Sequence, residues 1–141
     1  MDETAYDPNN IFAKILRKEA PCHFVYEDAD TFAFMDIMPR SDGHTLVIPK
    51  KPARNILDAG PSILGPLILT VQRIAISAKT AFSADGITIS QFSERAGGQI
   101  VFHLHFHVLP RYAGVELRPP GIMGDSALIA QHAEKLRAAL G

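Results

Sequence analysis

The pattern of apolar and polar positions divides the chain into short elements separated by turns. Apolar residues recur with helical spacing after Asn10, a residue type that caps helices, and Pro21 ends the pattern. We therefore expect a short N-terminal helix with an apolar edge formed by Ile11, Phe12, Ile15 and Leu16. Strand-forming residues on both sides of the turn 27–30 then predict a β-hairpin, with strands over residues 24–27 and 31–35.

Longer apolar segments predict the centre of the fold. Residues 44–48 are nearly all apolar, which is typical of a central strand buried on both faces. Residues 62–82 have helical spacing, and Pro66 should bend or restart the first turn of this long helix. Residues 87–92 predict a strand antiparallel to the next one. After a loop rich in proline and glycine, Asp125 and Ser126 are expected to cap an amphipathic C-terminal helix.

The segment from Gly97 to Arg111 carries the least ordinary pattern. As a strand with a period of two, it places one set of alternate residues on an apolar face, namely Ile100, Phe102, Leu104, Phe106 and Val108. The opposite face would carry His103, His105 and His107, spaced roughly 6 to 7 Å apart. Three histidines at consecutive outward positions favour a chemical role over an ordinary solvated strand face.

Two chemistries suit such a row of imidazoles. Neutral imidazole is a common metal ligand, although a third histidine on one straight strand is too far away to join the same tetrahedron. The alternative is nucleophilic and acid–base catalysis at phosphorus, for which the central His105 has an imidazole on each side. The glycines at 97 and 98, which allow a close approach of the backbone to a ligand, and the cation of Arg111 favour this alternative.

Composition narrows the class of protein. The 141 residues fit a single domain, 1–141, with a core over about residues 10–112 and a tail and helix over 113–141. The formal charge of −1 gives no reason to expect nucleic acid or a membrane as partner. The apolar run Ile63–Val71 is too short to span a bilayer, and Met1–Thr4 is acidic, unlike a secretory signal. With Cys22 as the single cysteine, we expect a cytoplasmic protein.

The segment His103-Leu104-His105-Phe106-His107-Val108-Leu109 resembles the signature of the histidine triad family, in which histidines alternate with apolar residues. Blocks at residues 11–15, 25–28, 33–39 and 43–50 are similar to family blocks in the same order, so the resemblance covers about residues 10–112. It is nearest to the small Hint-like branch of nucleotide hydrolases. It implies an α+β fold: a meander of about five antiparallel strands, one long helix, and a homodimer formed through that helix and neighbouring strands.

The resemblance also implies roles for individual residues. His105 would be the nucleophile, His107 would donate to a phosphate or leaving oxygen, His103 would support His105, and His44 would hydrogen-bond behind the triad. Asp36 would accept from the ribose hydroxyls, and Gln99 and Gly98 would lie near the phosphate. The purine ring would lie beside Ile11, Phe12, Ile15, Phe34 and Ile37. The reaction cleaves a purine nucleotide conjugate at the α-phosphate and needs neither metal nor cofactor.

Two positions depart from the family pattern. Phe92 lies seven residues before Gln99, where relatives carry an Asn or Gln, and Ile100 occupies a position where some carry a serine that meets the leaving group. These replacements shift the expected substrates from phosphoramidates toward dinucleoside polyphosphates, or toward slow generic turnover. Two other functions stay open: a sensor that binds AMP with little turnover, and a metal-binding β-module that uses His103, His105 and His107.

Overall fold

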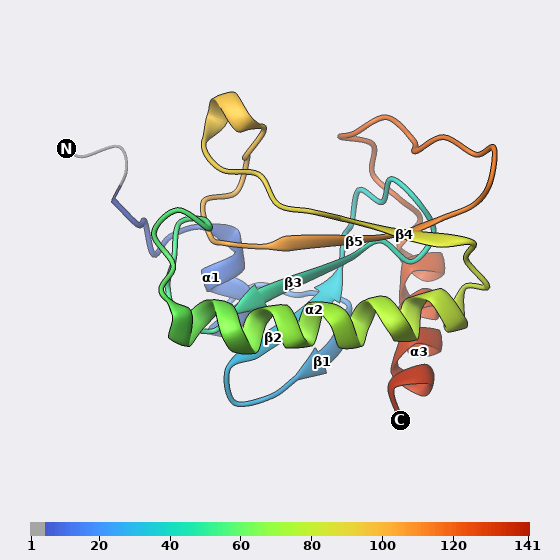
Figure 1. Cartoon of the computed structure of the whole chain (residues 1–141), viewed down its shortest axis with the longest axis horizontal. Coiled ribbons are helices and arrows are strands. Elements are labelled where there is room, and N and C mark those ends of the chain that lie inside the picture. The colour runs from blue at the N-terminus through green and yellow to red at the C-terminus, as the bar shows by residue number, and fades with distance from the viewer. Residues whose placement is uncertain (1–4) are drawn as a thin grey trace.

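The computed structural model describes residues 5–141 (Figure 1). Met1–Thr4, the residues on which the argument against a secretory signal depends, lie outside this range. The elements in chain order are α1 (Ile11–Leu16), β1 (Phe24–Glu27), β2 (Thr31–Met35), β3 (Thr45–Pro49), α2 (Pro61–Ala81), β4 (Gly86–Ser90), the short 3-10 helix η1 (Arg95–Gly97), β5 (Phe106–Arg111) and α3 (Ser126–Leu140).

The five strands form one antiparallel sheet in the order β1-β2-β3-β5-β4. The predicted α+β class, the hairpin and the pairing of β4 with the histidine strand are therefore confirmed. β3 is the central strand and is buried along its whole length, as its apolar sequence predicts. Asn10 caps α1 by accepting from the amide of Ala13, and Asp125 caps α3 by accepting from the amides of Ala127 and Leu128.

Helices cover both faces of the sheet, and α2 crosses one of these faces (Figure 1). Alternate residues of β3 point into two separate apolar clusters. Val47 joins the larger cluster, which includes the buried residues of α2 and α3. Leu46 and Ile48 join the smaller cluster, which includes Phe12 and Ile15 of α1. This second face is the one that carries His107, because Leu46 is the partner of His107 in the β3–β5 register.

The prediction of one straight strand through residues 100–108 is wrong. β5 begins only at Phe106, and residues 101–103 are bends. Ile100 is 85% exposed, so it does not contribute to the core. Phe102 instead packs against two guanidinium groups, with Arg54 at 4.2 Å and Arg95 at 5.2 Å from its ring centre. His103 and His105 therefore do not share a strand face with His107.

α2 is a single helix that includes Pro66, so this proline does not restart it. By length and composition alone, α2 is the one helix among the described residues that could cross a membrane. The expectation that no segment spans a bilayer considered only the apolar run of residues 63–71, which is shorter than this helix. A core helix meets the same test, so this is weak support for a membrane span. The buried residues of α2 are Leu67, Thr70, Val71, Ile74 and Ala78, whereas Ile68, Leu69 and Ile76 are exposed.

Candidate active site

His105 lies immediately before β5, and its hydrogen bond assigns its tautomer. The ring nitrogen Nδ1 is 2.7 Å from the main-chain oxygen of His103. A carbonyl oxygen can only accept, so Nδ1 carries the proton and Nε2 carries a lone pair. Burial lowers the pKa of His105, which keeps the imidazole neutral at neutral pH. The ring also meets Phe12 edge-on, with centroids 4.9 Å apart. His105 is thus oriented as a nucleophile or base at Nε2.

A second chain of hydrogen bonds ends at His107. The amide of Arg40 donates to Nδ1 of His44 at 3.1 Å, so the proton of neutral His44 is on Nε2. This Nε2 lies 2.9 Å from Nδ1 of His107 and donates to it. The remaining proton of His107 is therefore on Nε2, which faces away from His44. Arg40 acts at this point through its main chain, and no feature of its side chain could have indicated this role from sequence.

Both imidazoles of this chain are neutral. Burial is the main cause that lowers the pKa of His44 to about 3 and the pKa of His107 to about 4. Each pKa is lowered further because a second positive charge would lie nearby, on His107 in the case of His44 and on His105 in the case of His107. The rings of His105 and His107 are neighbours, with centroids 5.1 Å apart. The site therefore presents one imidazole that accepts at Nε2 beside one that donates at Nε2, as acid–base chemistry between two groups requires.

Local backbone geometry brings His44 to this position. Gly43 has a φ of +88°, a left-handed conformation that favours glycine. A Cβ at this position would lie 2.6 Å from the ring of Phe82, so a larger residue would not fit without displacement of that ring. The main-chain amide of Asp36 then donates to the carbonyl of His44, which extends the β2–β3 pairing and places Asp36 beside the imidazoles.

Asp36, His44 and His107 each offer a ligand atom within 4.8 Å of the others, a spacing that would suit a metal ion. Hydrogen bonding accounts for this proximity. Asp36 Oδ1 accepts from the amide of Met38, and Oδ2 lies 3.4 Å from Nε2 of His44. A metal would need the lone pair of His44 Nε2, which would force its proton onto Nδ1, opposite the amide of Arg40. The hydrogen-bond partners of His44 thus favour hydrogen bonding over ligation.

The row of three histidine ligands in the metal-module hypothesis is contradicted by the contacts of His103. Its Nε2 lies 2.9 Å from the carbonyl of Pro49, and its Nδ1 lies 2.6 Å from the hydroxyl of Tyr6. Both ring nitrogens are therefore engaged within the protein. The contact of His103 with His105 is made by its main-chain carbonyl, while its own ring is anchored elsewhere.

The predicted purine-binding residues divide into a buried and an exposed set. Phe12, Ile15 and Phe34 are buried in one cluster, and Phe12 and Phe34 meet edge-on at 5.3 Å. Because Phe12 also contacts His105, this part of the apolar wall lies beside the imidazoles. Ile11 and Ile37 are 46% and 47% exposed and are available to a ring that approaches from solvent.

Gln99 is placed differently from the prediction that its amide lies near a phosphate. The side chain is buried, and its oxygen accepts from the amide of Glu94 at 2.8 Å and from Asn55 at 3.1 Å. Its nitrogen donates to the carbonyls of Arg54 at 2.7 Å and Val101 at 3.0 Å. The amide is thus saturated by protein groups, so in this structure Gln99 orders the loop before the triad.

Phe92 contacts the triad directly. Its ring meets that of His107 edge-on, with centroids 5.4 Å apart. Gly98, with a φ of +100°, comes so near that a Cβ at this position would lie 3.4 Å from the Phe92 ring. The position at which the resemblance implies an amide therefore presents an aromatic edge beside His107.

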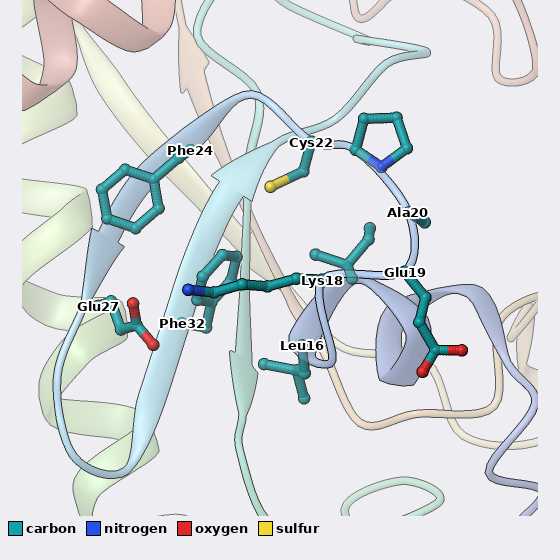
Figure 2. Close-up of a pocket in the computed structure, with 10 residues that line it drawn as sticks. Leu16, Lys18, Glu19, Ala20, Cys22, Phe24, Glu27 and Phe32 are labelled. Carbon is teal, nitrogen blue, oxygen red and sulfur yellow. The ribbon is translucent and has the colours of Figure 1, made fainter.

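A separate cavity of about 570 Å³ lies at the C-terminal end of α1 (Figure 2). Among the described residues, the imidazoles are outside its lining, although Ile15 belongs both to the cavity and to the predicted purine wall. A series of neighbouring rings in tilted or edge-to-face contact connects the two regions, in the order Phe24, Phe32, Phe34, Phe12 and His105. Sequence patterns did not indicate this cavity. Its lining is Ile15, Leu16, Lys18, Glu19, Ala20, Pro21, Cys22, Phe24, Glu27 and Phe32.

Comparisons with known proteins agree with this geometry. The HIT domain profile matches residues 17–114. A crystal structure described as a Hit-like protein involved in cell-cycle regulation, from Bartonella henselae, has a TM-score of 0.91 and 55% identity, covering 96% of this chain and 99% of that one. The chain belongs to the HIT family.

Two relatives of similar sequence differ in how far their function is known. The uncharacterized HIT-like protein MT1300 of Mycobacterium tuberculosis is 40% identical over 107 residues, which cover 76% of this chain and 74% of the relative. Adenylylsulfatase HINT3 of Arabidopsis thaliana is 34% identical over 101 residues, which cover 72% of this chain and 51% of the relative. The name of HINT3 assigns a hydrolytic activity on an adenylyl conjugate to that protein.

Proposed function

We propose that this protein is a nucleotide hydrolase that cleaves purine nucleotide conjugates at the α-phosphate through a covalent nucleotidyl-histidine intermediate. The observation that carries the proposal is the complementary pair of tautomers: Nε2 of His105 has a lone pair and Nε2 of His107 has a proton. The name adenylylsulfatase for HINT3 supports adenylyl conjugates as the substrate class.

The reaction proceeds in two displacements. Nε2 of His105 attacks the α-phosphorus, and the bond from phosphorus to the leaving group breaks. The leaving group departs against the Nε2–H of His107, which stabilises its charge, and takes a proton from solvent. Water then attacks phosphorus and loses a proton to solvent, which replaces the proton that the leaving group took, while the Nε2–H of His107 donates to a phosphate oxygen. The phosphorus–nitrogen bond breaks, nucleoside monophosphate leaves, and both imidazoles return to their first state. Dividing one displacement into two lowers each barrier, and the second step uses the same hydrogen-bond donor.

The substrate would be held by groups on either side of the imidazoles. Asp36 would accept from the ribose hydroxyls, and the base would lie against Phe12, Phe34 and the exposed Ile11 and Ile37. Burial raises the pKa of Asp36, and ribose hydroxyls would add hydrogen bonds to the one that this carboxylate accepts from the amide of Met38. Phe92 would meet the leaving-group side, where an apolar edge offers no hydrogen bond to a polar leaving group.

Replacing His105 by Ala tests this proposal. With a fluorogenic AMP ester or amide, we expect turnover to fall on the order of a thousandfold or more, because the nucleophile is lost. AMP binding, measured by calorimetry, should persist. His132→Ala is a matched control, since this histidine lies on α3 against Phe82. Intact-mass spectrometry of rapidly quenched wild-type protein should detect the nucleotidyl adduct, and His105→Ala should lack it.

An AMP sensor is the second candidate. It is favoured by the saturated amide of Gln99 and by Phe92 and Ile100, which leave fewer polar groups for a phosphate and a leaving group. The two functions differ in one result. Tight AMP binding by wild-type protein, with turnover equal to that of His105→Ala, would establish a sensor and refute the hydrolase. A panel of sulfate, amine, acyl and phosphate leaving groups would extend the comparison to the preferred substrate.

We also propose that the active form is a homodimer built on α2 and β4. Ile68, Leu69 and Ile76 of α2 are at least half exposed, and β4 is an edge strand with Ile89 45% exposed. A second copy would remove this apolar surface from water. Sedimentation should give a dimer for the wild type and a monomer for Leu69→Asp, with Leu57→Asp, another exposed leucine outside α2, as the control. A monomeric wild type would contradict the proposal.

A further inference from the structure

Tyr6 lies in the segment that precedes α1 and contacts the first imidazole of the triad. Its hydroxyl is 2.6 Å from Nδ1 of His103, and the two rings meet edge-on with centroids 5.6 Å apart. We propose that Tyr6 is a positioning residue: by fixing the His103 ring, it holds the main-chain carbonyl that orients His105. The activity test of this inference rests on the proposed hydrolase function, whereas the spectroscopic test does not.

The hydrogen bonds of His103 require a donor at Nδ1. Nε2 lies 2.9 Å from the carbonyl of Pro49, so Nε2 carries the proton. Burial lowers the pKa of His103 to about 4, and the neutral ring then has only a lone pair at Nδ1. The hydroxyl of Tyr6 supplies the donor, and it stays protonated at neutral pH because burial raises its pKa. The buried ring is thus fixed at both nitrogens.

The side-chain contacts of His103 matter for its position because this residue precedes β5 and has no strand hydrogen bonds of the sheet to hold it. β5 starts at Phe106, after both His103 and His105. Residues 103 and 104 are held to the rest of the protein by the hydrogen bond from the amide of Leu104 to the carbonyl of Ala53, at 2.8 Å, and by the two contacts of the His103 ring. Since the carbonyl of His103 accepts from Nδ1 of His105, a rotation at residue 103 moves the group that keeps the lone pair at Nε2.

Tyr6→Phe keeps the ring and removes the donor. An unpaired buried acceptor disfavours the observed arrangement, so we expect kcat to fall roughly fivefold to twentyfold. KM should stay within about twofold of the wild-type value, because a residue that acts through His103 adds no substrate contact. Tyr112→Phe is the matched control: its hydroxyl also makes a 2.6 Å hydrogen bond, to the carbonyl of Phe82. It should lower stability without lowering kcat.

A second measurement uses the protein without nucleotide. In nitrogen-15 NMR spectra of the histidine rings, wild-type His105 should show a protonated Nδ1 and an unprotonated Nε2. Tyr6→Phe should shift or broaden the His103 and His105 signals, whereas Tyr112→Phe should leave them unchanged.

The inference is overturned if the His105 signals of Tyr6→Phe match the wild type. It is also overturned if, in an active enzyme, kcat is unchanged or both variants lower it equally, which would indicate a general loss of stability. A wild-type protein without turnover would refute the hydrolase instead, and the spectra would still decide the role of Tyr6.

Discussion

His44→Phe removes the group that fixes the proton of His107. The phenyl ring fills similar space at a site where His44 is only 2% exposed, and it avoids burying a polar ring. Nδ1 of His107 then loses its 2.9 Å donor, and the tautomer with the proton on Nδ1 is no longer disfavoured. That tautomer has no proton at Nε2 for the leaving group.

The size of the effect follows from one buried hydrogen bond. A buried acceptor left without its donor costs about 1–3 kcal/mol, which corresponds to a decrease in kcat of roughly fivefold to 150-fold. The decrease should depend on the leaving group. Amine and alkoxide leaving groups need the donor at Nε2 and should lose the full amount, whereas sulfate and carboxylate depart as stable anions and should lose little.

The assay compares kcat for wild type and His44→Phe across that series of AMP conjugates, with thermal unfolding as a check on folding. A decrease in kcat that becomes larger as the pKa of the leaving group rises supports the assigned tautomer. An equal loss for sulfate and amine conjugates would refute the reasoning, since it would mean that His44 affects the site without affecting the proton of His107.

Two further predictions concern stability. The pKa values of His44, His103 and His107 are about 3, 4 and 4 in the folded protein, below the ordinary value of 6.5, so the unfolded chain binds more protons as the pH falls. Stability should be fully present above about pH 6.5 and decrease by several kcal/mol toward pH 4; urea unfolding across this range tests this, and a flat profile would contradict the buried neutral imidazoles. Gln99→Leu should lower the free energy of unfolding by about 2–4 kcal/mol, because it leaves the amide of Glu94 and the carbonyl of Arg54 unpaired. A much weaker AMP affinity with unchanged stability would instead indicate that the side chain of Gln99 contacts the phosphate.

Much of the fold was predictable from the sequence because its signals are local. Helical spacing after Asn10 and the nearly continuous apolar run of residues 44–48 led to elements that the structure confirms. The period-two pattern failed over residues 100–105 for a physical reason. The side chain of Gln99 hydrogen-bonds Asn55 and the carbonyl of Arg54, and the ring of Phe102 packs against the guanidinium of Arg54, so both residues depend on partners that are distant in sequence.

The candidate site also has parts that the sequence predicted and parts that it did not. The triad segment was recognisable because its residues are consecutive. The link from His44 to His107 followed only from the resemblance to the family, since these residues are 63 positions apart. The contact between Tyr6 and His103 spans 97 positions and had no signal in the pattern, which indicated merely a polar segment before the first helix. Hydrogen-bond partners across a sheet are set by tertiary packing, and a single sequence does not display them.

The distance in sequence between these partners has a consequence for how the proposed active site forms. Tyr6 meets His103 and His44 meets His107, and each pair joins distant parts of the chain, so both contacts form only when the elements around them have taken their places. Contacts between residues so far apart in sequence form late in folding, because the connecting loops must close first. The imidazoles should therefore reach their working arrangement only at the end of folding, and recovery of turnover after dilution from denaturant would report completion of the whole domain.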